Sequence, residues 1–269
     1  MAVPDLYIKQ DAFTDPGAFA DLYRNLSTSP GELRDIVSRS IIHVAWAAQY
    51  GVPSDMPLSR ATLPASERLK LIGSFGDRKE QRSFGTCRDY ALMLTSMLRH
   101  LSIPARVRCG FATYFTPGPF EDHWICEYWS TANRWIRSDA QLDQFHRDHL
   151  GIHFDAADLP ADVFLTAGEA WRRARSSRAD AAAFGQGNAR GLWFLRVNVY
   201  RDLLALTNRY TSAWDNWRNA TDGSKVLEPS ALAAVDSVAD MIGDFEAGAA
   251  GLASLTAIAA KHQLPPWQS

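Results

Sequence analysis

Cysteine is scarce in this sequence of 269 residues. The three cysteines, Cys87, Cys109 and Cys126, are an odd number and include no CxxC pair. That usage argues against a disulfide framework and against a cysteine-rich zinc site. We therefore expect a reducing, cytoplasmic setting and a protein that uses neither a metal nor a cofactor.

A strong charge of one sign and long apolar runs are also missing. The formal net charge is −2, so no basic field points to nucleic acid or an anionic membrane. No apolar run approaches the roughly 20 residues of a membrane-spanning helix. The first residues, MAVPDLYIKQDAF, lack the basic and then apolar segments of a secretory signal. We expect no nucleic-acid or membrane partner, and the sequence indicates no particular oligomeric state.

What is present is the composition of a globular protein, with 46% hydrophobic and 22% charged residues. Apolar residues at helical spacing predict a helix over Gly31–Tyr50, a shorter one over Pro64–Ile72 and a buried one over Cys87–Leu101. A period of two then predicts a strand over Val107–Phe111. From Pro160 onward the pattern is mostly helical. This order predicts an α+β fold whose core is followed by a C-terminal all-helical region.

Two strands joined by a turn are predicted over His123–Trp129 and Arg134–Asp139. Residues of antiparallel strands pair at a constant sum of their numbers, and the turn between these two gives 262 or 263. His123 then lies opposite Asp139 or Ala140. An imidazole beside a carboxylate is a base with a group that orients it.

Cys87 lies where a helix is expected to begin, directly after Gly85 and Thr86. Unpaired N–H groups and the positive end of the helix dipole surround a thiol in the first helical turn, and both favour the thiolate. The N–H of Cys87 lies in the same turn and could serve a developing oxyanion. The sequence thus offers Cys87 as nucleophile, His123 as base and Asp139 as orienting acid. The alternative for Cys87 is a small, buried structural thiol.

Linked motifs carry a family resemblance. They are GTCRDYA with the following IPARVRCGF, then DHWICEYW, then RWIRSDAQLD, in this order over residues 84–143. This segment resembles the core of the transglutaminase-like superfamily, of the bacterial type, with its GxCxxxA helix, IPAR strand entry, H-x-W-x-E strand and W-x-x-x-D strand. In this chain Trp124 follows His123 directly, one place earlier than in many members. Ala140 stands where many members have a proline.

The resemblance implies a papain-like fold, with the catalytic-cysteine helix packed on a small antiparallel sheet after N-terminal helices. It implies the same roles for Cys87, His123 and Asp139. It implies no particular substrate, because proteases, amidases, protein cross-linkers, acyl transferases and inactive scaffolds all occur in the superfamily. We expect a catalytic core over residues 1–158 and a helical extension over residues 159–269 that packs on the core and shapes the substrate cleft.

Several neighbouring residues have two interpretations. Gln81 precedes Cys87 by six residues, a spacing at which papain-like proteases carry an oxyanion-hole amide, but a glutamine in a polar stretch is usually solvated. Trp124 either packs in the interior or contacts substrate. Asp89, in the first turn of the helix, is expected to cap that helix.

Two further groups of residues lie outside the motifs. His146, His149 and His153 have the spacing of a metal-binding helix face, but Gly151 interrupts that helix and we expect no metal. Polar residues inside the apolar pattern after Gly191 could line a substrate cleft or form buried ion pairs. These polar residues are Arg196, Asn198, Arg201 and Asp202.

The predicted function is cysteine-dependent acyl transfer on a small-molecule or peptide amide, ester or thioester, through a thioester at Cys87. The acyl group then passes to water, as in a hydrolase or peptidase, or to an amine. Two alternatives stay open. One is a biosynthetic tailoring enzyme that uses the same three residues on a small amino-acid-like or carrier-bound acyl group. The other is a non-catalytic binding module that keeps the fold, and the intact Cys-His-Asp set is evidence against it.

Overall fold

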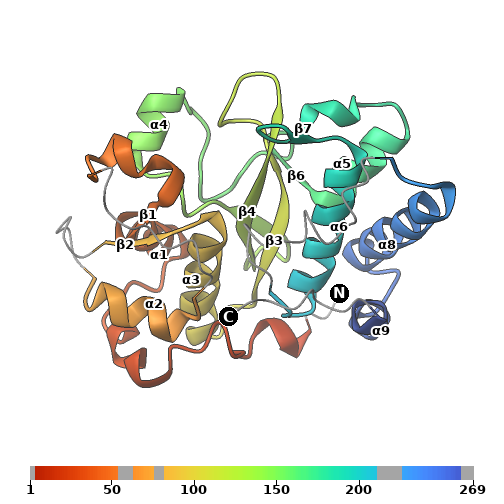
Figure 1. The fold of residues 1–269 in the computed structure, drawn as a ribbon. Coiled ribbons are helices and arrows are strands. Elements are labelled where there is room, and N and C mark those ends of the chain that lie inside the picture. Colours follow the sequence, from red (N-terminus) through yellow and green to blue (C-terminus); the bar gives the residue numbers. More distant parts are fainter. Residues whose placement is uncertain (1–3, 54–62, 76–81, 211–225, 262–269) are drawn as a thin grey trace. The chain divides into compact units, whose positions relative to one another are not determined.

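The structure is a computed structural model that describes residues 4–53, 63–75, 82–210 and 226–261 (Figure 1). Its contacts group the chain into two compact units. Ala2–Val107 and Trp124–Leu159 form the N-terminal unit, and Arg108–His123 and Pro160–Ser269 form the C-terminal unit. No described helix is both long enough and apolar enough to cross a membrane. The division into a core of residues 1–158 and an extension of residues 159–269 stays a prediction.

The N-terminal unit is built mainly of short helices (Figure 1). The helices predicted over Pro64–Ile72 and Cys87–Leu101 are confirmed as α2 and α3. The described α-helices are α1 (Pro30–Ser40), α2 (Ala65–Ile72), α3 (Cys87–His100) and α4 (Gln144–Leu150), and the 3-10 helices are η1 (Asp5–Tyr7), η2 (Gly17–Tyr23) and η3 (Val44–Tyr50).

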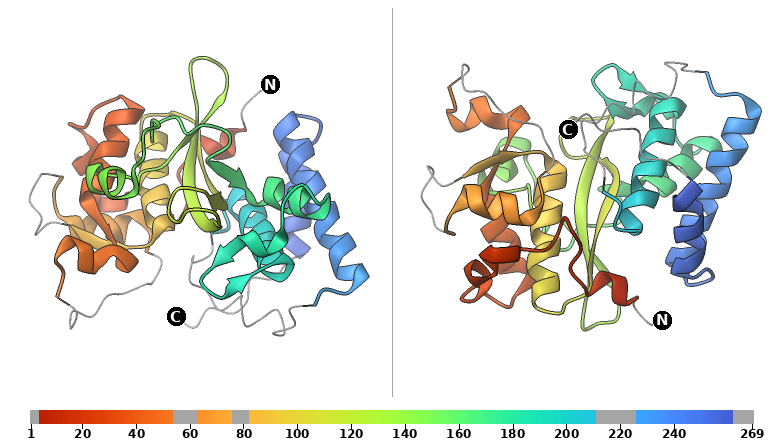
Figure 2. Two further views of the ribbon diagram at one scale, coloured as in Figure 1. Left: turned by 90° about the horizontal axis from the view of Figure 1, so that it is seen from above. Right: turned by 60° about the horizontal axis from the view of Figure 1, so that its bottom comes forward.

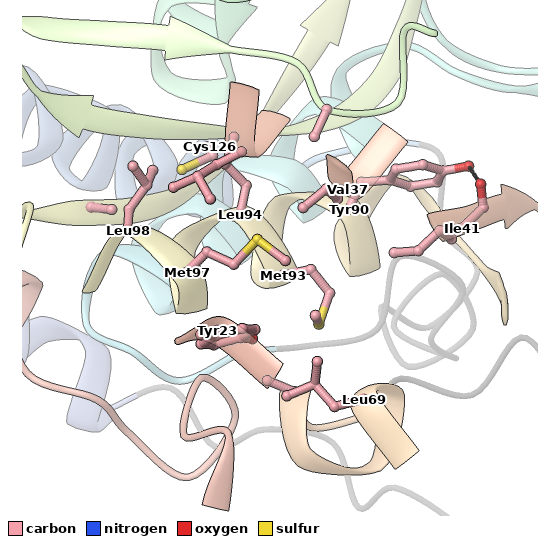
Figure 3. Packing of buried hydrophobic residues seen from close by; sticks show 14 of the residues in the cluster. Tyr23, Val37, Ile41, Leu69, Tyr90, Met93, Leu94, Met97, Leu98 and Cys126 are labelled. Atoms are coloured by element: carbon pink, nitrogen blue, oxygen red, sulfur yellow. Dashed lines mark hydrogen bonds between the residues drawn. The ribbon is translucent and has the colours of Figure 1, made fainter. Parts of the chain in front are cut away.

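Helix α3 lies at the centre of this unit's core. Every residue from Cys87 to Arg99 is buried. Apolar side chains of α3 pack with those of α1 and α2 and with Cys126 in one hydrophobic cluster (Figure 3). At one end of the cluster, the Tyr90 hydroxyl donates to the carbonyl of Ile41 at 2.8 Å. Because interiors are close-packed, a helix enclosed in this way has little freedom to shift, and its first residue is held with it.

The helix predicted over Gly31–Tyr50 is not continuous, because a strand follows Ser40 before the 3-10 helix η3 begins at Val44. Helix α1 ends at Ser40, and Ile41–His43 form strand β1, which pairs in parallel with β2 (Ser83–Gly85). Two β-branched isoleucines favour a strand at this point. The Ser40 hydroxyl also bonds back to the carbonyl of Ile36 at 2.7 Å, a contact that competes with continued helix.

The larger sheet has strand order β6-β3-β4-β7-β8, and β5 also pairs with β4. The pairs β3–β6, β4–β5 and β7–β8 are antiparallel, whereas β4–β7 is parallel. The α+β class is therefore confirmed, with one parallel pair in a sheet that was expected to be antiparallel. The strands are β3 (Ala105–Ala112), β4 (Phe120–Trp129), β5 (Trp135–Ser138), β6 (Phe164–Thr166), β7 (Phe184–Gln186) and β8 (Ala189–Arg190).

The predicted hairpin is confirmed as β4 and β5, but its register differs from the prediction. Cys126 lies opposite Ser138, so paired residue numbers sum to 264 and not to 262 or 263. The turn is centred later than expected, with Asn133 in the left-handed conformation (φ 56°). The ladder ends at the Cys126 and Ser138 pair, so His123 and Asp139 are not opposite each other in it.

In the C-terminal unit, the expectation of an all-helical region after residue 159 is wrong. Strands β6, β7 and β8 also lie there, and each is only two or three residues long. Strands this short leave little periodic signal, and β6 and β7 take their partners from β3 and β4. Helices α5, α6 and α8 lie side by side (Figure 1 and Figure 2). The helices are α5 (Ala167–Arg175), η5 (Ala181–Ala183), α6 (Leu192–Leu206), α8 (Pro229–Ala247) and α9 (Leu252–Lys261).

Polar residues of α6 form buried ion pairs within the C-terminal unit. Both carboxylate oxygens of Asp202 accept from Arg108 of β3, at 2.9 and 2.8 Å. Arg108 also pairs with Glu246 at 2.6 Å. Arg201 lies 3.7 Å from a carboxylate oxygen of Asp122. Of the two alternatives for the polar residues of this helix, buried ion pairs are confirmed for Arg201 and Asp202.

Candidate active site

Cys87 is the first residue of α3, as the sequence predicted. The preceding Thr86 caps the helix, and both its N–H (2.7 Å) and its hydroxyl (3.1 Å) donate to Oδ2 of Asp89. Gly85 leaves room for this carboxylate, because a Cβ there would lie 3.0 Å from both Cβ and Oδ2 of Asp89. Gly85 and Thr86 therefore both fit around the Asp89 side chain, and this arrangement places Cys87 at the start of the helix.

Asp89 is itself held by a buried ion pair. Its Oδ1 lies 2.7 Å from Nη2 of Arg68 on α2, and both side chains are 1% exposed. Arg68 also donates to the carbonyl of Phe84 in β2. The capping role expected for Asp89 is confirmed. Together these contacts join α2, β2 and the first turn of α3 around Cys87.

Cys87 is the most exposed of the three cysteines, at 8%, whereas Cys109 and Cys126 are fully buried. Burial raises the pKa of the Cys126 thiol to about 12, although a 3.3 Å hydrogen bond from the Thr95 hydroxyl opposes the rise. Cys109 donates to Oδ1 of Asn198 at 3.1 Å. Cys109 and Cys126 are therefore core residues, and Cys87, although buried, is the least enclosed of the three thiols.

Asp139 directly follows β5 and is 1% exposed. Its N–H donates to the carbonyl of Ala156 at 2.8 Å, and its own carbonyl accepts from Nη1 of Arg34 at 3.1 Å. The carboxylate oxygen Oδ1 accepts the N–H of Gln141, also at 2.8 Å. Both the backbone and the carboxylate of Asp139 are thus fixed by other parts of the N-terminal unit.

His123 lies in β4, as the last residue of the segment Arg108–His123. Its side chain is buried, and its ring centroid lies 4.8 Å from that of Phe115 and 5.9 Å from that of Tyr114. Two aromatic rings therefore cover this imidazole. The structure assigns Cys87 and Asp139 to the N-terminal unit and His123 to the C-terminal unit.

A comparison with known families identifies the segment that carries these residues. Residues 74–140 match the model of the transglutaminase-like superfamily. The match spans about a quarter of the chain and includes Cys87, His123 and Asp139.

The chain thus contains a transglutaminase-like segment over residues 74–140. The resemblance drawn from its linked motifs is therefore confirmed. Members of this superfamily are typically cysteine enzymes.

Among solved structures, the crystal structure of a proposed cysteine protease from Cytophaga hutchinsonii is similar to this chain, at 18% sequence identity and a TM-score of 0.37. The similarity covers 61% of this chain and 46% of that one. This chain thus spans less than half the length of that protein. The TM-score is too low to show that the two proteins share a fold. No curated protein matches the sequence significantly.

Gln81 and Trp124 were the two further candidates for contact with the oxyanion or the substrate, and the structure describes only Trp124. Trp124 is 1% exposed and packs in the interior. Its indole Nε1 is buried and has no hydrogen-bond partner among the described residues. Gln81 lies outside the described residues. The roles of both, and those of Cys87, His123 and Asp139, stay predictions.

The histidines after the transglutaminase-like core serve packing and hydrogen bonding. His146 of α4 is fully buried, and its N–H and Nδ1 lie 3.0 and 2.9 Å from Oδ1 of Asp143. The hydroxyl of Tyr50 lies 3.0 Å from the same Nδ1. The ring of His149 stacks on that of Phe145. Across the described ranges, no three His, Cys, Asp or Glu side chains are grouped as metal ligands.

One feature that the sequence analysis missed is a pocket of about 520 Å3 in the N-terminal unit. Its described lining includes four arginines from separate parts of the chain. Only the first two share an element, α1, so no local motif marks the group. The four are Arg34, Arg39, Arg82 and Arg147.

Proposed function

We propose that this transglutaminase-like protein is a cysteine-dependent acyl-transfer enzyme that uses Cys87, His123 and Asp139. The observation that carries the proposal is the position of Cys87 as the first residue of α3, inside the segment that the family match covers. N–H groups of a first helical turn have no partner within the helix, and they stabilise negative charge on a sulfur beside them. The N–H of Cys87 is the proposed donor to the oxyanion.

The proposed reaction has two halves. The Cys87 Sγ attacks the carbonyl carbon of an amide, ester or thioester, and the bond to the leaving group breaks as that group takes a proton from the His123 imidazolium. This step leaves an acyl thioester on Cys87 and a neutral His123. Water or an amine then attacks the thioester and gives its proton to His123, and the Cys87 thiolate leaves.

Asp139 is the proposed orienting acid for His123. A carboxylate in this role holds the imidazole in one tautomer and stabilises its charged form without taking the proton itself. The bonds that Asp139 makes with Ala156, Gln141 and Arg34 support the role, because they fix the carboxylate independently of the base. The proposed substrate class is a small-molecule or peptide amide. Exclusion of water from the thioester decides between hydrolysis and transfer to an amine.

Trapping the acyl-enzyme tests this proposal. Treatment with p-nitrophenyl acetate should place one acetyl group per chain on Cys87, located by peptide mass spectrometry. Cys87→Ala should abolish the adduct, whereas Cys109→Ser, which keeps a donor for Asn198, should retain it. An amine that speeds loss of the acetyl group identifies a transferase, and a rate independent of every amine identifies a hydrolase. A wild-type protein without an adduct, or an equal adduct in Cys87→Ala, would contradict the proposal.

A further inference from the structure

The pocket missed by the sequence analysis lies in the N-terminal unit, lined by residues of α1, η3 and α4 and by Arg82 just before β2. Its volume of about 520 Å3 falls in the range of small-molecule sites. Among its described lining residues, four arginines face two aspartates, Asp35 and Asp143, a formal charge of +2. A pocket of this size and charge suits a small anion.

Both aspartates are already engaged by neighbouring side chains. The carboxylate of Asp35 pairs with Arg34 of the same helix. Asp143 accepts the hydroxyl of Tyr50 at 2.6 Å and the N–H of His146 at 3.0 Å. Neither carboxylate therefore needs a cation from outside, and the remaining positive charge of the pocket is carried by the other arginines.

Arg34 forms a fixed wall of the pocket. The side chain is buried, and its Nη1 donates to the carbonyls of Asp139 and Leu142 at 3.1 and 2.7 Å. Nε donates to Asp35 at 3.0 Å. With its donors committed in this way, Arg34 shapes the pocket and adds charge, but it is not the group that would bind a ligand.

Arg147 has donors in reserve. Its Nη2 donates to the neutral amide oxygen of Gln144 at 2.6 Å. Its Nε is buried and has no hydrogen-bond partner among the described residues. A guanidinium whose described hydrogen bond goes to a neutral amide has donor capacity left for a charged oxyanion, which makes the stronger hydrogen bond.

Arg82 is positioned by an aromatic ring. Its guanidinium carbon lies 5.5 Å from the ring centroid of Tyr50, whose hydroxyl is tied to Asp143 and His146. A cation–π contact of this kind uses none of the N–H donors of a guanidinium, and such donors suit a planar or tetrahedral oxyanion. Arg82 and Arg147 thus both line this pocket, and each brings a guanidinium group that can donate two parallel hydrogen bonds to one anion.

We propose that this pocket binds a small oxyanion, a carboxylate or a phosphate group, through Arg82 and Arg147. Arg39 adds positive charge to the same lining. The site goes beyond the proposed cysteine chemistry and does not depend on it. It lies in the unit that carries Cys87, and Arg82 precedes Cys87 by five residues.

Isothermal titration of the full chain with inorganic phosphate and, separately, with succinate tests the site, at ionic strength held constant with sodium chloride. We expect saturable binding of at least one probe. Tighter binding of phosphate assigns the site to phosphate groups, tighter binding of succinate assigns it to carboxylates, and equal binding supports the shared oxyanion chemistry. Absence of saturable binding for both probes into the tens of millimolar would overturn the proposal.

Substitutions then locate the bound anion. Arg147→Gln and Arg82→Gln should each weaken binding at least about tenfold, the loss expected for a charge-assisted hydrogen bond. Arg147→Lys keeps the charge without the fork and should fall between wild type and Arg147→Gln. Arg24→Gln, at a side chain that is 71% exposed and outside the pocket, is the matched control and should bind as wild type. Circular dichroism confirms that each variant is folded. Binding that is unchanged in folded Arg147→Gln and Arg82→Gln proteins would overturn the assignment.

Discussion

Replacing Asp89 by asparagine tests the ion pair that holds the first turn of α3. Asparagine keeps the size of the side chain and an oxygen for Thr86, but it removes the charge opposite Arg68. That guanidinium is 1% exposed and lies 2.7 Å from the carboxylate. Breaking a buried pair from one side costs about 3–5 kcal/mol, because the other charge is left uncompensated. We expect the free energy of unfolding to fall by about this amount.

Urea denaturation followed by tryptophan fluorescence measures the effect. Asp21→Asn is the matched control, because it breaks an ion pair with Arg24 whose two side chains are 71% and 79% exposed. That change should cost less than about 0.5 kcal/mol. Adding Arg68→Met to Asp89→Asn should recover part of the loss, since neither charge of this pair then remains. An Asp89→Asn protein as stable as Asp21→Asn would refute the reasoning.

Two further substitutions test contacts elsewhere in the chain. Asp143→Asn should destabilise the protein at neutral pH but not in acid. Burial raises the pKa of Asp143, but hydrogen bonds from His146 and Tyr50 outweigh burial and hold it below the ordinary value of 3.8. The carboxylate therefore contributes its full stability above that value and loses it as the pH falls through the lower pKa of the folded state. Urea midpoints of the two proteins should converge in acid, and a constant gap at every pH would contradict the assignment. Gly110→Ala should destabilise the C-terminal unit by about 1–3 kcal/mol or more, because the new Cβ would lie 2.1 Å from the carbonyl oxygen of Leu165 in β6. Gly251→Ala, where nothing lies within 4 Å of the new Cβ, is its control, and equal urea midpoints for the two variants would show that β3 and β6 do not approach as described.

Local patterns were enough to predict α3 and the hairpin of β4 and β5. Thr86 marks the start of α3, and the apolar residues that follow have helical spacing over the whole element. The hairpin has aromatic and β-branched strands on either side of a polar turn. Its register was wrong because the centre of the turn depends on Asn133, whose left-handed conformation the residue type permits but does not require.

Strands with distant partners were beyond the sequence analysis. Ile41–His43 form a strand only because Ser83–Gly85 lie alongside, and Phe164–Thr166 only because they pair with Gly110–Ala112. Each has the apolar content of the neighbouring helix and is too short to show a period of its own. Tertiary pairing decided the outcome in both places.

The candidate site also has one part that local sequence patterns predict and another that depends on distant residues. The position of Cys87 follows from its neighbours Gly85, Thr86 and Asp89, so it was predictable. The bonds that fix Asp139 come from residues that are not its sequence neighbours. Arg34 lies far from it in sequence, and Ala156 is separated from it by α4 and a loop. The arginine pocket likewise gathers separate segments, and nothing in the spacing of its residues brings them together before the chain folds.

Alkylation of Cys87 tests the central claim most directly. At pH 6 an ordinary thiol is less than about 1% thiolate, so it reacts slowly with iodoacetamide. The account predicts that Cys87 in the wild-type protein reacts at least about tenfold faster than such a thiol, that Cys109 and Cys126 stay unlabelled while the protein is folded, and that His123→Ala removes most of the acceleration. A Cys87 that reacts at the rate of an ordinary thiol at pH 6, with or without His123, would contradict the account.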